Sequence, residues 1–127
     1  MKILVVEDKE ADAKLLRSVL ERGGHEVFRA ESAEQAMQML EDGGESAVPQ
    51  AIVTDLDLPQ MDGVTLARHL HGVARTAHIP VIAVTAYPDH FPQGSGDRDC
   101  FAAYVVKPID TRSLAGLVAT VCANHRN

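Results

Sequence analysis

The chain has 127 residues, 46% hydrophobic and 24% charged, which is an ordinary composition for one globular domain. Its 12 basic and 18 acidic residues give a formal net charge of -6, and no lysine or arginine cluster is present to meet a phosphate backbone, so direct nucleic-acid binding is not expected. No apolar run approaches the roughly 18 residues of a membrane span, and no secretion signal opens the chain. We therefore expect a cytoplasmic protein that does not bind membranes, with Cys100 and Cys122 as reduced thiols.

Short apolar runs alternate with helical patterns along the chain. Strands are predicted at residues 3–6 and 26–30, from 51 towards Asp55, and at 80–85 and 104–106. Helices are predicted over residues 10–22, after a capping box at Ser32 as far as Gly43, from Asp62 through residue 73, and from residue 110 or 111 through residue 121. This alternation is typical of an α/β domain in which helices cover both faces of a parallel sheet.

The segment between Thr85 and Tyr104 interrupts the pattern, because a helix is due there and the residues oppose one. A proline at position 92 would cost about 3 kcal/mol inside a helix. Glycines at positions 94 and 96 would add roughly 1 kcal/mol each relative to alanine. We therefore expect the helix in the stretch from Pro88 to Cys100 to be short or irregular. The chain stops soon after the last predicted helix, so we expect a single domain, residues 1–127, without an output domain.

Polar residues stand at the carboxyl ends of four predicted strands: Glu7 and Asp8, Asp55, Thr85, and Lys107. In an open parallel sheet these ends meet in one cleft, where ligands bind. Three carboxylates placed close together repel one another. A hard divalent cation that binds their oxygen atoms would neutralise them, and we expect Mg²⁺.

The same residues suit phosphoryl chemistry. An ionised carboxylate is a competent nucleophile towards phosphorus and gives an aspartyl-phosphate. Phosphoryl transfer depends mainly on positioning and on neutralising charge over three oxygens. A metal ion, Lys107 and the Thr85 hydroxyl would supply that neutralisation from three sides.

These residues and their neighbours resemble the receiver domain of bacterial two-component response regulators. The resemblance extends over the whole chain, and residues 78–86 are similar to single-domain regulators of the chemotaxis and cell-cycle kind, DivK among them. It implies a flavodoxin-like, doubly wound, five-stranded parallel sheet with strand order 2-1-3-4-5. The motifs that carry it are Glu7-Asp8, Asp55 with Pro59 and Asp62-Gly63, Thr85-Ala86, and Lys107-Pro108.

The resemblance also implies a role for each site residue. Asp55 would be the phosphorylated residue, and Glu7, Asp8, Asp55 and the backbone carbonyl of Asp57 would hold Mg²⁺. Thr85 and Lys107 would contact the phosphoryl oxygens, and Thr85 and Tyr104 would form the switch. The phosphoryl donor would be a histidine kinase or a histidine phosphotransfer protein, and the signal would pass to a downstream protein effector that the sequence does not name. Such a protein phosphorylates itself and later removes its own phosphoryl group, and it is not a turnover enzyme.

Two other interpretations of the same residues stay open. Asp55-Leu-Asp57 is an Asp-x-Asp, as in phosphatases of the haloacid dehalogenase type, although in that family the motif follows the first strand and here it follows the third. Alternatively, the chain is a pseudo-receiver that binds its partner constitutively and is never phosphorylated. Within the receiver interpretation, a half-buried structural tyrosine is an alternative to a moving switch at Tyr104.

Overall fold

The computed structural model describes residues 2–42, 48–56, 58, 63–73, 76–86, 101–107 and 114–125. Five parallel strands form a sheet in which the hydrogen-bonded order is β2-β1-β3-β4-β5. This order confirms the flavodoxin-like, doubly wound α/β fold that the sequence led us to expect. The strands are β1 (Lys2–Val6), β2 (Glu26–Ala30), β3 (Ala51–Asp55), β4 (Val81–Thr85) and β5 (Ala103–Val106).

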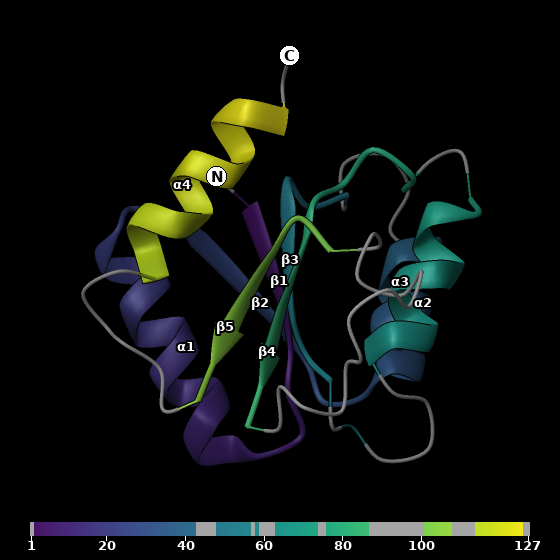
Figure 1. Ribbon diagram of the computed structural model, residues 1–127. Helices are drawn as coiled ribbons and strands as arrows, with labels where there is room; N and C mark the ends of the chain where they lie inside the picture. The colour runs from purple at the N-terminus through teal and green to yellow at the C-terminus, as the bar shows by residue number, and fades with distance from the viewer. Residues whose placement is uncertain are drawn as a thin grey trace.

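The described helices cover both faces of the sheet (Figure 1). On one face are α1 (Glu10–Arg22) and α4 (Leu114–His125), and on the other are α2 (Ala33–Asp42) and α3 (Gly63–His71). Each pair encloses its own cluster of buried apolar side chains, so the sheet has a hydrophobic core on either side. None of these helices has the length and apolar character needed to cross a membrane.

The central strands β3 and β4 are buried over their whole length. Successive side chains of β3 enter opposite cores, as Ile52 and Val53 illustrate. This two-sided burial is why these strands are nearly continuous apolar runs rather than alternating ones. The polar residues Asp55 and Thr85, both 2% exposed, end the two strands at the same edge of the sheet.

Helix boundaries follow local chemistry that the sequence already contains. The Ser32 hydroxyl oxygen accepts a hydrogen bond from the Gln35 backbone N–H at 3.0 Å and so opens α2. The Gln35 side chain reaches back and accepts from the Glu31 backbone N–H at 2.6 Å, one residue earlier than in a standard capping box. After the C-terminal end of α1, Gly24 has a φ of +89°, a conformation that glycine adopts readily and that ends the helix.

Several predictions lie outside the described residues and stay predictions. The expected irregular helix is the largest of them, since residues 87–100 are not described. The same holds for the end of α2 at Gly43, for the Asp62 cap of α3, and for a cap of the last helix at Asp110 or Thr111.

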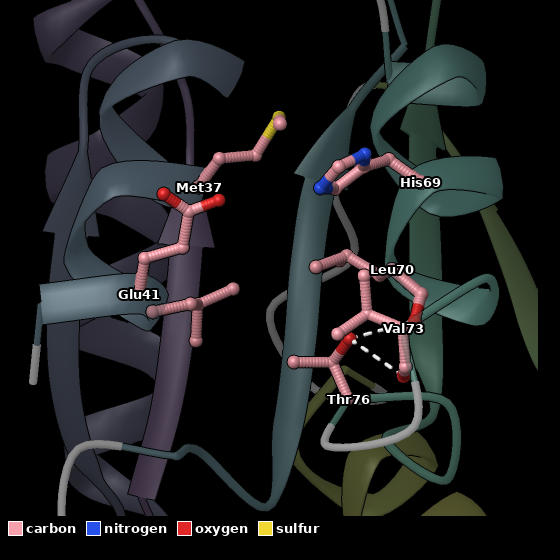
Figure 2. Close-up of a pocket in the computed structure, with 7 residues that line it drawn as sticks. Met37, Glu41, His69, Leu70, Val73 and Thr76 are labelled. Carbon is pink, nitrogen blue, oxygen red and sulfur yellow. Dashed lines mark hydrogen bonds between the residues drawn. The ribbon is translucent and has the colours of Figure 1, made fainter. Parts of the chain in front are cut away.

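A small pocket of about 50 Å³ lies between α2 and α3 (Figure 2). It is lined by side chains from the C-terminal halves of both helices and from the turn after α3. These helices return antiparallel to the strands, so the pocket lies towards the amino ends of the strands, away from Asp55 and Thr85. It is not part of the strand-end cleft. The lining residues are Met37, Leu40, Glu41, His69, Leu70, Val73 and Thr76.

Replacing Ser32 with alanine should destabilise the protein by about 1 kcal/mol, because the Gln35 N–H loses its partner at the start of α2. In a domain of this size that corresponds to a fall of about 4 °C in Tm. Thermal denaturation followed by circular dichroism measures it. Ser18→Ala is the matched control, since Ser18 is exposed in the middle of α1 and alanine there is neutral or stabilising. Equal Tm changes in the two variants would contradict the cap.

Candidate functional site

The strand register brings the predicted site residues to one edge of the sheet. Asp55 pairs with Val84, the residue before Thr85, and Thr85 pairs with Val106, the residue before Lys107. The Lys107 backbone N–H donates to the Thr85 carbonyl at 2.8 Å, which fixes these two residues side by side. The carboxyl ends of β1, β3, β4 and β5 therefore form a continuous edge, as the sequence predicted.

Lys107 joins the carboxylates at this edge. Its ammonium group donates to Asp55 Oδ2 at 3.0 Å, to Asp12 Oδ2 at 3.0 Å and to Glu7 Oε1 at 3.2 Å. An ammonium group has three N–H donors, so all three are used. Burial alone would lower the pKa of Lys107, but the hydrogen bonds to Asp55 and Asp12 and the charges of Asp55 and Glu7 raise it above its usual value. Lys107 is therefore a fixed positive charge in contact with Asp55.

Glu7, Asp8 and Asp55 form a compact acidic group. Each offers a carboxylate oxygen, and these oxygens lie within 4.8 Å of one another. Glu7 and Asp55 are buried, whereas Asp8 is exposed and leaves one side of the group open to water. All the donors are oxygen atoms, and water can reach one side of the group. Mg²⁺ prefers oxygen ligands and usually keeps several waters.

The Glu7 carboxylate carries the clearest sign that the group fits a cation. Its Oε2 atom is buried and has no hydrogen-bond partner among the described residues. Leaving a buried acceptor unsatisfied costs roughly 1–3 kcal/mol, and a divalent cation between the three carboxylates would remove that cost. The residues present therefore fit Mg²⁺.

Glu7 also has an unusual protonation equilibrium. Burial raises the pKa of Glu7 to about 8, and Asp55 adds to this because a protonated Glu7 can donate a hydrogen bond to it and avoids the charge repulsion between the two acids, while Lys107 acts in the opposite direction. Without a metal ion, Glu7 therefore holds a proton at neutral pH. Binding of a cation would release that proton, because a ligating carboxylate must be ionised.

Two residues of the site were not anticipated from the sequence. Asp12, in the first turn of α1, contacts Lys107, and the hydrogen bond from Lys107 is the main reason that the pKa of Asp12 is lowered. Arg29 of β2 donates to the Glu7 carbonyl at 3.2 and 3.3 Å and thereby holds the connection between β1 and α1. One feature of the sequence could have pointed to Asp12, which lies four residues after Asp8, at the start of a helix that faces the strand ends. No feature of the sequence pointed to Arg29.

Three predicted residues lie less centrally. Thr85 is buried at the end of β4, beside Lys107. Tyr104 lies further back along β5, where it pairs with Ala83 and is half-buried with its ring edge-on to Phe101 at a centroid distance of 5.5 Å. Asp57, predicted to bind the metal through its backbone carbonyl, lies outside the described residues.

Comparison with known proteins gives a consistent family. Residues 3–119 match the family model of the response regulator receiver domain. The polar-differentiation response regulator DivK of Brucella ovis is 32% identical over 107 residues, covering 84% of each chain. A sensor protein from Polaromonas sp. JS666 is 29% identical, with a TM-score of 0.87 over 98% of this chain and 97% of that one.

One further solved structure bears on the metal. The receiver domain of the sensor histidine kinase PA1611 from Pseudomonas aeruginosa is 25% identical to this chain. The two superpose with a TM-score of 0.77 over 96% of this chain and 97% of the other. That structure has a magnesium ion coordinated in its active-site cleft.

The protonation of Glu7 predicts a pH-dependent stability for the metal-free protein. The folded-state pKa of about 8 lies above the ordinary value of 4.5, so the folded state binds the proton more tightly. Its contribution to stability is therefore complete below about pH 4.5 and is lost as the pH rises through about 8. Glu7→Gln, which mimics the protonated side chain and cannot titrate, should remove this loss.

Thermal unfolding in EDTA at pH 6 and pH 8 measures the difference. The Tm of the wild type should fall by at least about 4 °C more than the Tm of Glu7→Gln between pH 6 and pH 8. A difference of about 4 °C corresponds to about 1 kcal/mol in a domain of this size. All other side chains are the same in the two proteins, so their effects cancel in the comparison. Parallel pH profiles would show that Glu7 is ionised in the folded protein at pH 6.

Proposed function

This chain belongs to the family of response regulator receiver domains of two-component signalling, and from that membership we propose that Asp55 accepts a phosphoryl group from a phosphohistidine of a partner protein. The observation that supports the proposal most directly is the Lys107 ammonium, 3.0 Å from Asp55 Oδ2. Asp55 is also the member of the acidic group that ends the central strand β3. A histidine kinase or a histidine phosphotransfer protein would be the donor.

The transfer is an in-line displacement at phosphorus. A carboxylate oxygen of Asp55 attacks, and its new bond to phosphorus forms as the bond from phosphorus to the imidazole nitrogen of the donor breaks. The imidazole keeps the electron pair of the broken bond and takes up a proton. Lys107 and the Thr85 hydroxyl stabilise the charge on the phosphoryl oxygens, which is where catalysis of this reaction acts.

Mg²⁺ is the cofactor of this proposal. Glu7, Asp8, Asp55 and the backbone carbonyl of Asp57 would hold it, and when bound it would neutralise charge on the acids and on the phosphoryl oxygens. Support comes from the orphaned Oε2 of Glu7 and from the magnesium ion in the related PA1611 receiver domain.

Phosphorylation would then switch the affinity for a downstream protein. The new group carries about -1.5 to -2 charges and recruits Thr85 and Lys107. Shifting an equilibrium from 1:99 to 99:1 needs roughly 5.5 kcal/mol, and this lies within the range of about 3–9 kcal/mol that two or three charge-assisted hydrogen bonds supply at about 1.5–3 kcal/mol each. Movement of Thr85 would pass to Tyr104 through the neighbouring strand β5.

The alternative functions have less support. Asp55 ends β3, the third strand, whereas the Asp-x-Asp of haloacid dehalogenase phosphatases follows the first, and the family match is to receivers. A pseudo-receiver differs from a receiver only in never being phosphorylated. The retained contact between Lys107 and Asp55 favours the receiver, and labelling of Asp55 distinguishes the two.

Asp55→Asn should abolish labelling, because an amide is not a nucleophile towards phosphorus. Wild type incubated with Mg²⁺ and acetyl phosphate should take up close to one phosphoryl group per chain, as measured by intact-protein mass spectrometry. Asp42→Asn, which neutralises an exposed acid at the end of α2, is the matched control and should label like wild type. Labelling of Asp55→Asn equal to wild type would refute Asp55 as the acceptor, and an unlabelled wild type would favour the pseudo-receiver.

Thr85→Ala should still be labelled but should switch incompletely. Loss of one hydrogen bond worth about 2 kcal/mol would reduce the share of the active conformation from about 99% to roughly three-quarters. Amide NMR shifts in β5, recorded with Mg²⁺ and beryllofluoride as a phosphoryl mimic, report this share. Wild-type shifts in Thr85→Ala would mean that Thr85 has no part in the switch.

A further inference from the structure

We infer that Asp12 is a positioning residue that holds the Lys107 ammonium group beside Asp55 when the acidic group carries its cation. This inference rests on the proposed function, in which Lys107 must meet the phosphoryl group on Asp55. It concerns a side chain of α1 that is not among the polar residues predicted at the carboxyl ends of the strands. Asp12 touches neither the reacting phosphorus nor the cation in this scheme, and it acts through Lys107.

The three acceptors of Lys107 are not equivalent. Glu7 and Asp55 belong to the group of three carboxylates that fits a cation, and Asp12 does not. Asp12 nevertheless makes a contact of 3.0 Å, as short as that of Asp55 and shorter than that of Glu7. Its carboxylate comes from the start of α1 and is half-buried, with 32% of the side chain exposed. Lys107 is thus held from two sides, and on one of them its partner, Asp12, lies outside the group of three carboxylates.

The arrangement matters because a cation changes the other two contacts. A divalent ion bound by Glu7 and Asp55 would neutralise the charge of these carboxylates, so that they would attract Lys107 less, and it would repel the ammonium group directly. Asp12 keeps its full charge, since it is not a ligand. It is therefore the anchor that keeps Lys107 within reach of Asp55 against that repulsion.

A purely local role for Asp12 makes a different prediction. Acids in the first turn of a helix stabilise it through the helix dipole, and α1 has two, Glu10 and Asp12. Glu10 is exposed and pairs only on the surface, with Lys14 at 3.4 Å. Glu10→Gln therefore removes the same charge from the same turn without touching Lys107, and it is the matched control for Asp12→Asn.

The first readout is the lysine ammonium signal in ¹H–¹⁵N NMR spectra at saturating Mg²⁺. Only a held, water-protected ammonium group exchanges slowly enough to be seen, and Lys107, with a side chain 15% exposed, is such a group, whereas Lys14, at 76%, is not. The Lys107 signal should be present in wild type and Glu10→Gln and lost in Asp12→Asn. Asp12→Glu, which restores the charge, should recover it at least in part.

The second readout is the rate of labelling by acetyl phosphate at saturating Mg²⁺. In this reaction the bond from phosphorus to the acetate oxygen breaks as the bond to Asp55 forms, and acetate leaves with the electron pair. Asp12→Asn should be about tenfold slower than wild type, with Glu10→Gln unchanged and Asp12→Glu within about threefold of wild type.

Two results would overturn the inference. One is an Asp12→Asn protein that keeps both the protected ammonium signal and the wild-type rate. The other is a rise of tenfold or more in the Mg²⁺ concentration that half-saturates Asp12→Asn, which would make Asp12 a metal ligand instead. If wild type takes up no phosphoryl group, the proposed function fails, while the ammonium signal still decides whether Asp12 holds Lys107.

Discussion

The contact of one ammonium group with three carboxylates is the interaction on which the site depends. Lys107 meets Asp55, Glu7 and Asp12 within 3.2 Å, and these partners come from β3, from the end of β1 and from α1. Without that positive charge, the buried acids Glu7 and Asp55 would face each other across a few ångströms of low-dielectric interior. Burial is the main cause of the raised pKa of Glu7, the interaction with Asp55 adds to it, and Lys107 offsets these effects only in part. The remaining negative charge is what makes the site suited to a divalent cation.

The fold tolerates this concentration of charge because apolar cores on both faces of the sheet stabilise the rest of the domain. Two apolar cores pack against the two faces of the sheet, Asp55 and Thr85 end their strands, and Glu7, Asp8 and Lys107 follow within two residues of a strand end. Arg29 adds a further restraint by donating to the Glu7 carbonyl. A preorganised edge of this kind suits a reaction whose catalysis consists mainly of positioning and charge neutralisation.

Much of this could be predicted from the sequence, because most of the signals are local. The boundaries of α1 and β2 matched the predicted ranges, since a helical stripe, two glycines and the apolar pair Val27 and Phe28 mark them. The strand-end residues were predictable because a parallel sheet brings the carboxyl ends of its strands together. Asp12 and Arg29 were not predicted, because their roles arise from contacts with residues 95 and 22 positions away, and only Asp12, four residues after Asp8, had a feature in the sequence that pointed to the site. Asp57 and the proline- and glycine-rich stretch from Pro88 to Cys100 lie outside the described residues, so those predictions stand as made.

The most direct test of the account is a crystal structure of the wild-type protein grown with Mg²⁺ and beryllofluoride. The account predicts a beryllofluoride group on a carboxylate oxygen of Asp55, with Lys107 and Thr85 in contact with its fluorines. It also predicts Mg²⁺ bound by Glu7, Asp8 and Asp55, with Asp12 still on Lys107. A bare Asp55 carboxylate at saturating beryllofluoride, or Mg²⁺ bound away from these three acids, would contradict it.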